Sequence, residues 1–183
     1  VLLSGRGEPE AQACEEIVKN SGLEWTVLRC SWFNQNFSEN YLLEPILAGE
    51  VALPVADVRE PFVDADDIAD AAVAALMDDK HVGQLYELTG PQLLTFAEAI
   101  EQIARASGRK IRYVHIPMDE YVAALEQAQL PADLIALIKY LFSEVLDGRN
   151  AYLADGVQSA LGRAPTEFGE YVRRAAASGA WRG

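Results

Sequence analysis

The sequence predicts an α/β fold built on a parallel sheet. Strand-like and helix-like patterns alternate up to about residue 115, which is typical of parallel βαβ units. Residues 25–28 form a short apolar run of the kind found in strands covered on both faces. Helical patterns dominate after residue 115. We therefore expect an α/β domain over residues 1–90 and a smaller, mostly helical lobe over residues 91–183.

The first elements follow from this alternation. Residues 1–4 are expected to end a strand, and Pro9 suits the first turn of a helix over about residues 10–20. Cys14, Ile17 and Val18 would give that helix an apolar stripe. A strand is expected over residues 25–29. A helix over residues 36–48 and an extended piece over residues 51–54 should follow.

Asp64 is a good N-cap for a helix that continues to about Met77. Asp66 and Asp67 would lie in its first turn, where negative charge complements the helix dipole. These carboxylates and Asp70 could instead suggest a divalent metal. The sequence lacks the glycine-containing acidic loop of a calcium site, so we expect no metal here.

The second half begins with a strand over residues 84–88. Thr95 and Glu98 form a capping box for a helix that ends near Gly108. A strand is expected over residues 111–116, and further helices are expected over about 118–127, 132–146, 155–161 and 166–177. The helix over 132–146 has more apolar residues than one face needs. They could pack within the lobe or form a dimer or partner surface.

Composition narrows the function classes. The chain has 183 residues, of which 50% are hydrophobic, and a net charge of −13. That charge argues against nucleic acid and anionic membranes as partners, since both demand a basic face. No apolar run approaches the roughly 20 residues of a membrane span. The two cysteines lack metal spacing, which favours reduced thiols in a cytoplasmic protein.

A candidate ligand site follows the strand at 25–29. In an open parallel sheet, ligands bind beyond the carboxyl ends of the strands. Trp32, Phe33, Asn34 and Asn36 would lie at that edge, although the two aromatics could also be core residues. Each asparagine could orient a substrate carbonyl or cap the next helix. Phe37 and Tyr41 could line a cavity or pack in the core.

Other polar residues suggest structural roles. Arg29 is expected in a buried ion pair, and His81 in a solvated loop. Neither His81 nor His115 has a serine or cysteine partner at a recognisable spacing, so a hydrolytic triad has little support. Cys14 is not expected to be a nucleophile, because its helical stripe should point inward.

Four segments in the same order resemble a known family. They are WTVLRCSWFNQNF, REPFVDADDIADAAVAAL, YELTGPQLLTFAEAIEQIARASGRKIRYVHIP and LGRAPTEFGEYVRRAAASGAW. Together they are similar to the NmrA-like, atypical short-chain dehydrogenases/reductases. The resemblance implies a Rossmann-type parallel sheet, of which this chain is the C-terminal part, with a C-terminal substrate or cap lobe. Residues 34–64 would contribute to the substrate cleft.

Two family features have no counterpart in this sequence. The N-terminal GxxGxxG turn, which holds the cofactor pyrophosphate, is absent, and Gly5-Arg6-Gly7 does not replace it. We therefore interpret the chain as truncated at its N-terminus, and expect that alone it aggregates or fails to bind dinucleotide. The Tyr and Lys of classical relatives fall at Gly7 and Ala11, as expected for the atypical branch.

The resemblance implies an NAD(P)H-dependent oxidoreductase that transfers hydride to a quinone- or dye-like small molecule. NAD and NADP both remain open. Cofactor-binding residues would be Ser4, Gly5, Cys30, Ser31, Trp32 and Phe33, although Ser4 and Gly5 could form a plain turn and Cys30 replaces the family's usual proline. Substrate-binding residues would be Trp32, Phe33, Asn36, Phe37 and Tyr41.

The resemblance also permits a second class of function. Some relatives are redox sensors that bind cofactor without turnover. Such a protein would sense NADP(H) and act on a regulatory protein partner through the helical lobe. A homodimer is a further possibility for that surface.

Overall fold

The structure is a computed structural model, and it describes residues 1–182. The chain forms two compact units, each assembled from three segments. Unit 1 consists of Val1–Gln35, Pro61–Leu93 and Tyr152–Tyr171, and unit 2 of Asn36–Glu60, Leu94–Ala151 and the residues from Val172 on. The division at Leu93 lies close to the expected boundary at residue 90. However, residues 36–60 and 152–171 cross that boundary, so the units are interleaved rather than consecutive.

Unit 1 contains the predicted parallel sheet. Its three strands lie in the order β1-β2-β5, and both pairings are parallel. Their bounds are Leu2–Gly5 for β1, Thr26–Cys30 for β2 and Gln84–Leu88 for β5. The register aligns Ser4, Arg29 and Glu87 in one row across the sheet. The prediction of an α/β fold is therefore confirmed.

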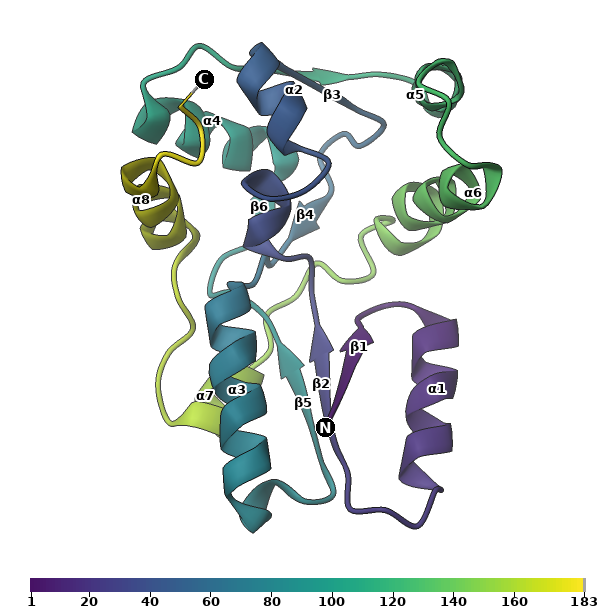
Figure 1. The fold of residues 1–183 in the computed structure, drawn as a ribbon, viewed down its shortest axis with the longest axis vertical. Helices are drawn as coiled ribbons and strands as arrows, with labels where there is room; N and C mark the ends of the chain where they lie inside the picture. The colour runs from purple at the N-terminus through teal and green to yellow at the C-terminus, as the bar shows by residue number, and fades with distance from the viewer. Residues whose placement is uncertain (183) are drawn as a thin grey trace. The chain divides into compact units, whose positions relative to one another are not determined.

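Helices cover the two faces of this sheet (Figure 1). On one face α1 (Pro9–Lys19) brings Glu15 to Ser4 and Arg29. On the other, α3 (Ala65–Met77) and α7 (Gly156–Leu161) pack on Leu28, Cys30 and Leu88. A short 3₁₀ turn, η2 (Asp79–His81), joins α3 to β5. This arrangement leaves the carboxyl ends of the strands to the loops that follow them.

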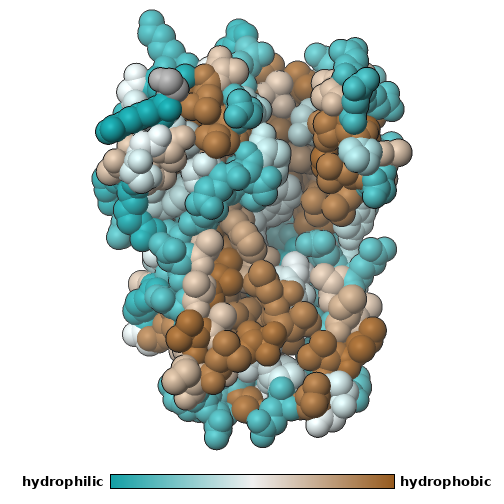
Figure 2. All heavy atoms as spheres, in the orientation of Figure 1, coloured by the Kyte–Doolittle hydropathy of each residue, from teal (hydrophilic) through white to brown (hydrophobic). Residues whose placement is uncertain are grey.

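The predicted stripe of α1 is wrong. Cys14 and Ile17 are exposed, and Glu15 is the buried residue of this helix. The row of polar residues on the sheet beneath α1 explains the reversal, because Arg29 and Ser4 provide Glu15 with partners there. Apolar side chains also lie open elsewhere on unit 1. Figure 2 shows a broad hydrophobic surface over this unit, whose exposed apolar residues include Val1, Leu3, Val73, Leu76 and Met77.

Unit 2 is mostly helical and has two small strand pairs. The parallel pair is β3 (Glu50–Leu53) with β7 (Arg112–His115), and the antiparallel pair is β4 (Arg59–Glu60) with β6 (Leu94–Thr95). The helices are α2 (Leu43–Ala48), α4 (Phe96–Ser107), α5 (Met118–Gln127), α6 (Ala132–Tyr140) and most of α8 (Phe168–Ser178). Phe96 is fully buried in this unit, with its ring centroid 6.0 Å from that of Phe37 and 6.4 Å from that of Phe142.

Local capping signals are confirmed. The Asp64 side chain accepts a hydrogen bond from the Asp66 backbone N–H, and Thr95 and Glu98 make a complete capping box. Two helix predictions are only partly right. Residues 36–48 contain the end of a 3₁₀ turn, η1 (Asn34–Phe37), and then α2, with no helix between them. Residues 132–146 divide into α6 and a π-helical turn, η3 (Leu141–Val145).

The apolar residues of the 132–146 segment divide in the same way. Phe142, Val145 and Leu146 are buried, whereas no residue of α6 is buried. Leu134 and Leu137, one turn apart on α6, remain 41% and 49% exposed. Core packing therefore accounts for the end of the segment and leaves α6 with an open apolar face. Among residues 1–182, no helix has the length and hydropathy needed to cross a bilayer.

Candidate functional site

Three loops of unit 1 meet at the carboxyl ends of β2 and β5, and backbone hydrogen bonds join them. Ser31 donates from its N–H to the Leu88 carbonyl at 3.1 Å, and Gly90 to the Pro61 carbonyl at 3.0 Å. Val63 donates to the Trp32 carbonyl at 2.9 Å and accepts from the Asn34 N–H at 2.8 Å. We call residues 30–35, 61–65 and 89–90 the strand-end loops. Their backbones form one fixed platform at the edge where α/β sheets bind ligands.

Side chains reinforce this platform. The Ser31 hydroxyl donates to the Pro61 carbonyl at 2.5 Å. Gln35 donates to Asp64 at 2.8 Å and accepts from the Ala65 N–H at 2.9 Å. Gly90 also approaches the backbone closely, because a Cβ atom there would lie 2.1 Å from the Phe62 carbonyl oxygen. The loops are thus preorganised by their own contacts.

Asn34 is the exception within the platform. Its side chain is completely buried, yet neither the amide nitrogen nor the amide oxygen has a hydrogen-bond partner among the residues that the structure describes. Burying such a group unpaired costs about 1–3 kcal/mol. Neither Asn34 nor Asn36 caps α2, whose N-cap is Leu42 and has no side-chain capping bond. The capping interpretation is therefore wrong for both.

The other loop residues predicted to bind cofactor have distinct environments. Trp32 and Phe33 are partly exposed, and Phe33 also packs against the core beneath α3. Cys30 is buried, and loss of solvation raises the pKa of its thiol to about 12. A thiol held neutral in this way is a packing residue rather than a nucleophile. The two aromatics provide the apolar surface of the platform.

Ser4 and Gly5 lie at the end of β1, next to a charged network. The Ser4 hydroxyl donates to Glu15 at 2.6 Å. Arg29 bridges two carboxylates, donating to Glu15 at 2.9 and 2.5 Å and to Glu87 at 3.0 Å. The predicted buried ion pair of Arg29 is confirmed. Burial opposes ionisation of Glu15, but the hydrogen bonds from Arg29 and Ser4 outweigh it and hold its pKa below the usual range.

Sequence reasoning missed the rest of this network. Arg6 is buried, stacks 3.8 Å from the Tyr152 ring centroid and lies 3.4 Å from a Glu87 carboxylate oxygen. Its guanidinium also donates to the Tyr152 carbonyl at 3.0 Å. Tyr152 is 146 residues from Arg6 in the sequence, so no local pattern could reveal the pair. The network fixes the chain that leaves β1 beside the strand-end loops.

His81 was predicted to be solvated, and this is wrong. Its side chain is 1% exposed, and its Nδ1 lies 2.8 Å from the Tyr86 hydroxyl. The Thr26 hydroxyl donates to the His81 carbonyl at 2.7 Å. These contacts join the η2 turn to the amino end of the sheet, opposite the strand-end loops. A structural role explains this histidine.

Three residues predicted to bind substrate belong to unit 2. Phe37 is fully buried against Phe96, and its carbonyl accepts a hydrogen bond from the Trp181 indole at 2.8 Å. Asn36 is partly exposed, and Tyr41 is 41% exposed. Phe37 thus packs in the core of its unit. The side chains of Asn36 and Tyr41 are partly accessible to solvent.

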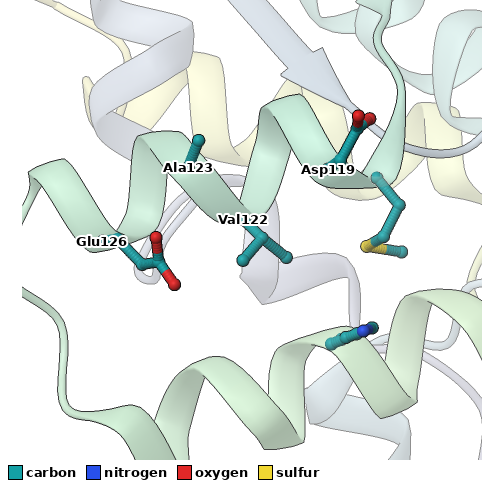
Figure 3. Close-up of a pocket in the computed structure, with 6 residues that line it drawn as sticks. Asp119, Val122, Ala123 and Glu126 are labelled. Atoms are coloured by element: carbon teal, nitrogen blue, oxygen red, sulfur yellow. The ribbon is translucent and has the colours of Figure 1, made fainter.

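Unit 2 also contains an open groove of about 520 Å³ between α5 and α6. Figure 3 shows Val122 and Glu126 projecting from α5 into the space between the two helices. The remaining lining residues are Met118, Asp119, Ala123 and Lys139. The groove therefore combines an apolar wall with two carboxylates and one ammonium group. Its volume is within the range of small-molecule sites.

Comparison with known proteins assigns the chain to a family. Residues 11–172 match the model of the NmrA-like family. This chain belongs to that family. The match includes parts of both units and all of the strand-end loops. The resemblance noted from four sequence segments is confirmed.

Two curated relatives and one solved structure illustrate the match. The chain is 36% identical over 84% of its length to the uncharacterized oxidoreductase YesF of Bacillus subtilis, covering 54% of that protein. It is 32% identical over 90% of its length to the NAD(P)H azoreductase of Xenophilus azovorans, covering 57% of that protein. The chain thus spans a little over half the length of these relatives.

The solved structure is an NADPH-dependent quinone oxidoreductase, QOR2, from Escherichia coli. It superposes with a TM-score of 0.77 at 22% identity, over 90% of this NmrA-like chain and 60% of that protein. At this identity the likeness establishes the fold. The Rossmann-type architecture expected from the sequence is thereby confirmed.

Proposed function

We propose that the protein containing this chain is an NAD(P)H-dependent oxidoreductase that transfers hydride to a quinone- or dye-like small molecule. The observation that carries the proposal is the 32% identity to an NAD(P)H azoreductase over 90% of this chain. The family match spans the strand-end loops, so it includes the candidate site. NADP and NAD both remain candidates for the cofactor.

One feature of the strand-end loops suits a nicotinamide cofactor. The buried amide of Asn34 offers polar atoms without a protein partner. Cofactor contacts are proposed for Ser4, Gly5, Cys30, Ser31, Trp32 and Phe33. Since the Ser4 and Ser31 hydroxyls donate within the protein, both would act through oxygen or backbone atoms.

When bound, the nicotinamide supplies the hydride, and the protein supplies orientation. The flat side chains of Trp32 and Phe33 would hold the acceptor ring, with Asn36 and Tyr41 as further substrate contacts and Phe37 as their support. Excluding water and keeping two rings parallel and close is mainly a proximity effect. Hydride transfer to an electron-poor ring needs no Tyr–Lys pair, in keeping with Gly7 and Ala11 at those positions.

The test is a steady-state assay of NADPH and NADH oxidation with a panel of quinones and dyes. It uses the full-length protein that contains this chain, and we expect turnover with at least one acceptor. Cofactor binding without turnover of any acceptor would rule out the proposed enzymatic activity. Failure to bind either dinucleotide would reject the cofactor site as well.

The second candidate is a redox sensor that binds NADP(H) and acts through a protein partner or a homodimer. The open apolar face of α6, with Leu134 and Leu137 half exposed, favours it. Sedimentation of the wild type and of Leu134→Glu/Leu137→Glu, with and without NADPH, tests this surface. A cofactor-dependent change in mass that the double variant abolishes supports the sensor, and an unchanged monomer in all four samples argues against a homodimer.

A further inference from the structure

Asn34 is held in place on both sides while its side chain stays unpaired. Its N–H donates to the Val63 carbonyl at 2.8 Å, and the next residue, Gln35, contacts Asp64 and Ala65. By contrast, the Ser31 and Gln35 side chains in the same loop make hydrogen bonds. Only the Asn34 amide, among the polar side chains of residues 30–35, is both buried and unpartnered. The backbone therefore holds the Asn34 amide in a fixed position within the loop.

The chemistry of this amide selects among ligands. An asparagine side chain offers an acceptor oxygen and a donor NH₂ group, and here both lack partners. A quinone carbonyl or a carboxylate can only accept, so either would leave the Asn34 oxygen unpaired. A primary carboxamide is complementary to both atoms at once. The nicotinamide ring of NAD(P) carries such a group.

We propose that the Asn34 side chain pairs with the nicotinamide carboxamide and so determines recognition of that ring. The inference rests on the proposed function, and it gives Asn34 a role that packing and helix capping do not explain. The position of Asn34 is consistent with it, because the residue lies in the loop that follows the carboxyl end of β2.

The experiment compares two ligands that differ by the nicotinamide ring. NADPH and 2′-phospho-ADP-ribose are titrated by calorimetry into the wild type and Asn34→Leu, both as the full-length protein that contains this chain. NADH and ADP-ribose serve instead if the wild type prefers NADH. We expect Asn34→Leu to weaken NADPH binding about ten- to a hundredfold, the loss of two hydrogen bonds, and to leave the affinity for 2′-phospho-ADP-ribose unchanged.

Thermal unfolding provides a readout independent of the cofactor. Leucine has a similar shape and no polar atoms, so the free variant should unfold at the same temperature as the wild type or higher. A lower midpoint with unchanged NADPH affinity would show that the amide serves the fold, and the inference would be wrong. Equal losses for both ligands would likewise overturn it.

A ligand-side substitution guards against a variant that fails to fold. Reduced 3-acetylpyridine adenine dinucleotide phosphate keeps the carbonyl but lacks the NH₂ group. The wild type should bind it several-fold more weakly than NADPH, and equal affinity would overturn the proposal. The wild type could bind 2′-phospho-ADP-ribose and yet bind NADPH and the acetylpyridine analogue equally well. That result would reject the proposed role of Asn34 but not the proposed cofactor site. If the wild type binds none of the ligands, the proposed function fails too.

Discussion

Arg29 on β2 donates hydrogen bonds to both carboxylate oxygens of Glu15 on α1, at 2.9 and 2.5 Å. This contact places a carboxylate at the one buried position of α1, and Ser4 adds a third hydrogen bond at 2.6 Å. It fixes α1 on the sheet beside the end of β1.

Glu15→Gln should lower the free energy of unfolding by about 2–3 kcal/mol. Removing one member of a buried ion pair leaves the other without compensation, although Glu87 still pairs with Arg29. Urea unfolding at pH 7 measures the loss. Glu16→Gln is the matched control. Glu16 lies on the exposed side of α1 and, within residues 1–182, its carboxylate pairs with Lys19 alone, so the change should alter stability by about 0.5 kcal/mol or less. Equal effects of the two variants would contradict the prediction.

The contribution of Glu15 should depend on pH. Because its pKa is lower in the folded protein, Glu15 stabilises the fold above the unfolded pKa of about 4.3. That stability is lost as the pH falls from there through the lower folded pKa. The difference in unfolding free energy between the wild type and Glu15→Gln should therefore shrink below about pH 4. Chemical denaturation at pH 3 to 7 measures it, and a constant difference would refute the assignment.

Asp67→Ala should be one of the most damaging single changes in unit 1, at about 3 kcal/mol. The buried Asp67 carboxylate accepts from Arg163 at 2.6 Å and from the Thr166 N–H and hydroxyl at 2.7 and 3.0 Å. Its loss leaves the Thr166 N–H and hydroxyl without this acceptor and removes one of the two carboxylates that pair with Arg163. Asp70 also pairs with Arg163 but is mostly exposed, so Asp70→Ala should cost about 1 kcal/mol or less. Thermal or urea unfolding of both variants measures the two losses in unfolding free energy. Equal losses would refute the predicted ranking.

The two cysteines should react at very different rates. Cys14 is exposed, whereas Cys30 is buried with its pKa raised to about 12, so its thiolate is rare at pH 8. Ellman's reagent should modify one thiol rapidly in the native protein and the second only after denaturation. Cys14→Ser should abolish the fast reaction and Cys30→Ser should retain it. Rapid modification of two thiols in the native state would count against this burial.

The isolated 183-residue chain should self-associate. Among the residues described, β1 pairs only with β2, which leaves its other edge unpaired, and Val1 and Leu3 beside that edge are about half exposed. Unpaired strand edges and apolar patches promote association. Sedimentation should show oligomers or aggregates for the isolated chain. A monomeric isolated chain that binds NADPH with micromolar affinity would contradict this expectation.

The element pattern was largely predictable from the sequence, because its signals are local. Asp64 caps the helix that it precedes, Thr95 and Glu98 close a capping box, and residues 84–88 form the expected strand. The strand-end position of residues 30–35 followed from the same alternation. The family was readable because four segments kept their order along the chain.

The side-chain environments were not predictable in this way. The periodicity of α1 predicted that Cys14 and Ile17 face the sheet. In the structure Glu15 faces it instead, because Glu15 pairs with Arg29, which lies 14 residues later in the sequence. His81 is buried and contacts the Tyr86 hydroxyl. Arg6 contacts Tyr152 because unit 1 is assembled from segments that lie far apart in the sequence.

The sequence by itself determined the order of strands and helices and the family, since hydrophobic period, capping and turn signals act within a few residues. Only the tertiary structure decided which polar groups are buried and paired, because their partners lie far away in the sequence. Asp67, for example, accepts a hydrogen bond from Arg163, which lies 96 residues later in the chain. The buried side-chain amide of Asn34 has no hydrogen-bond partner among the described residues. For this reason we propose that it pairs with the nicotinamide carboxamide.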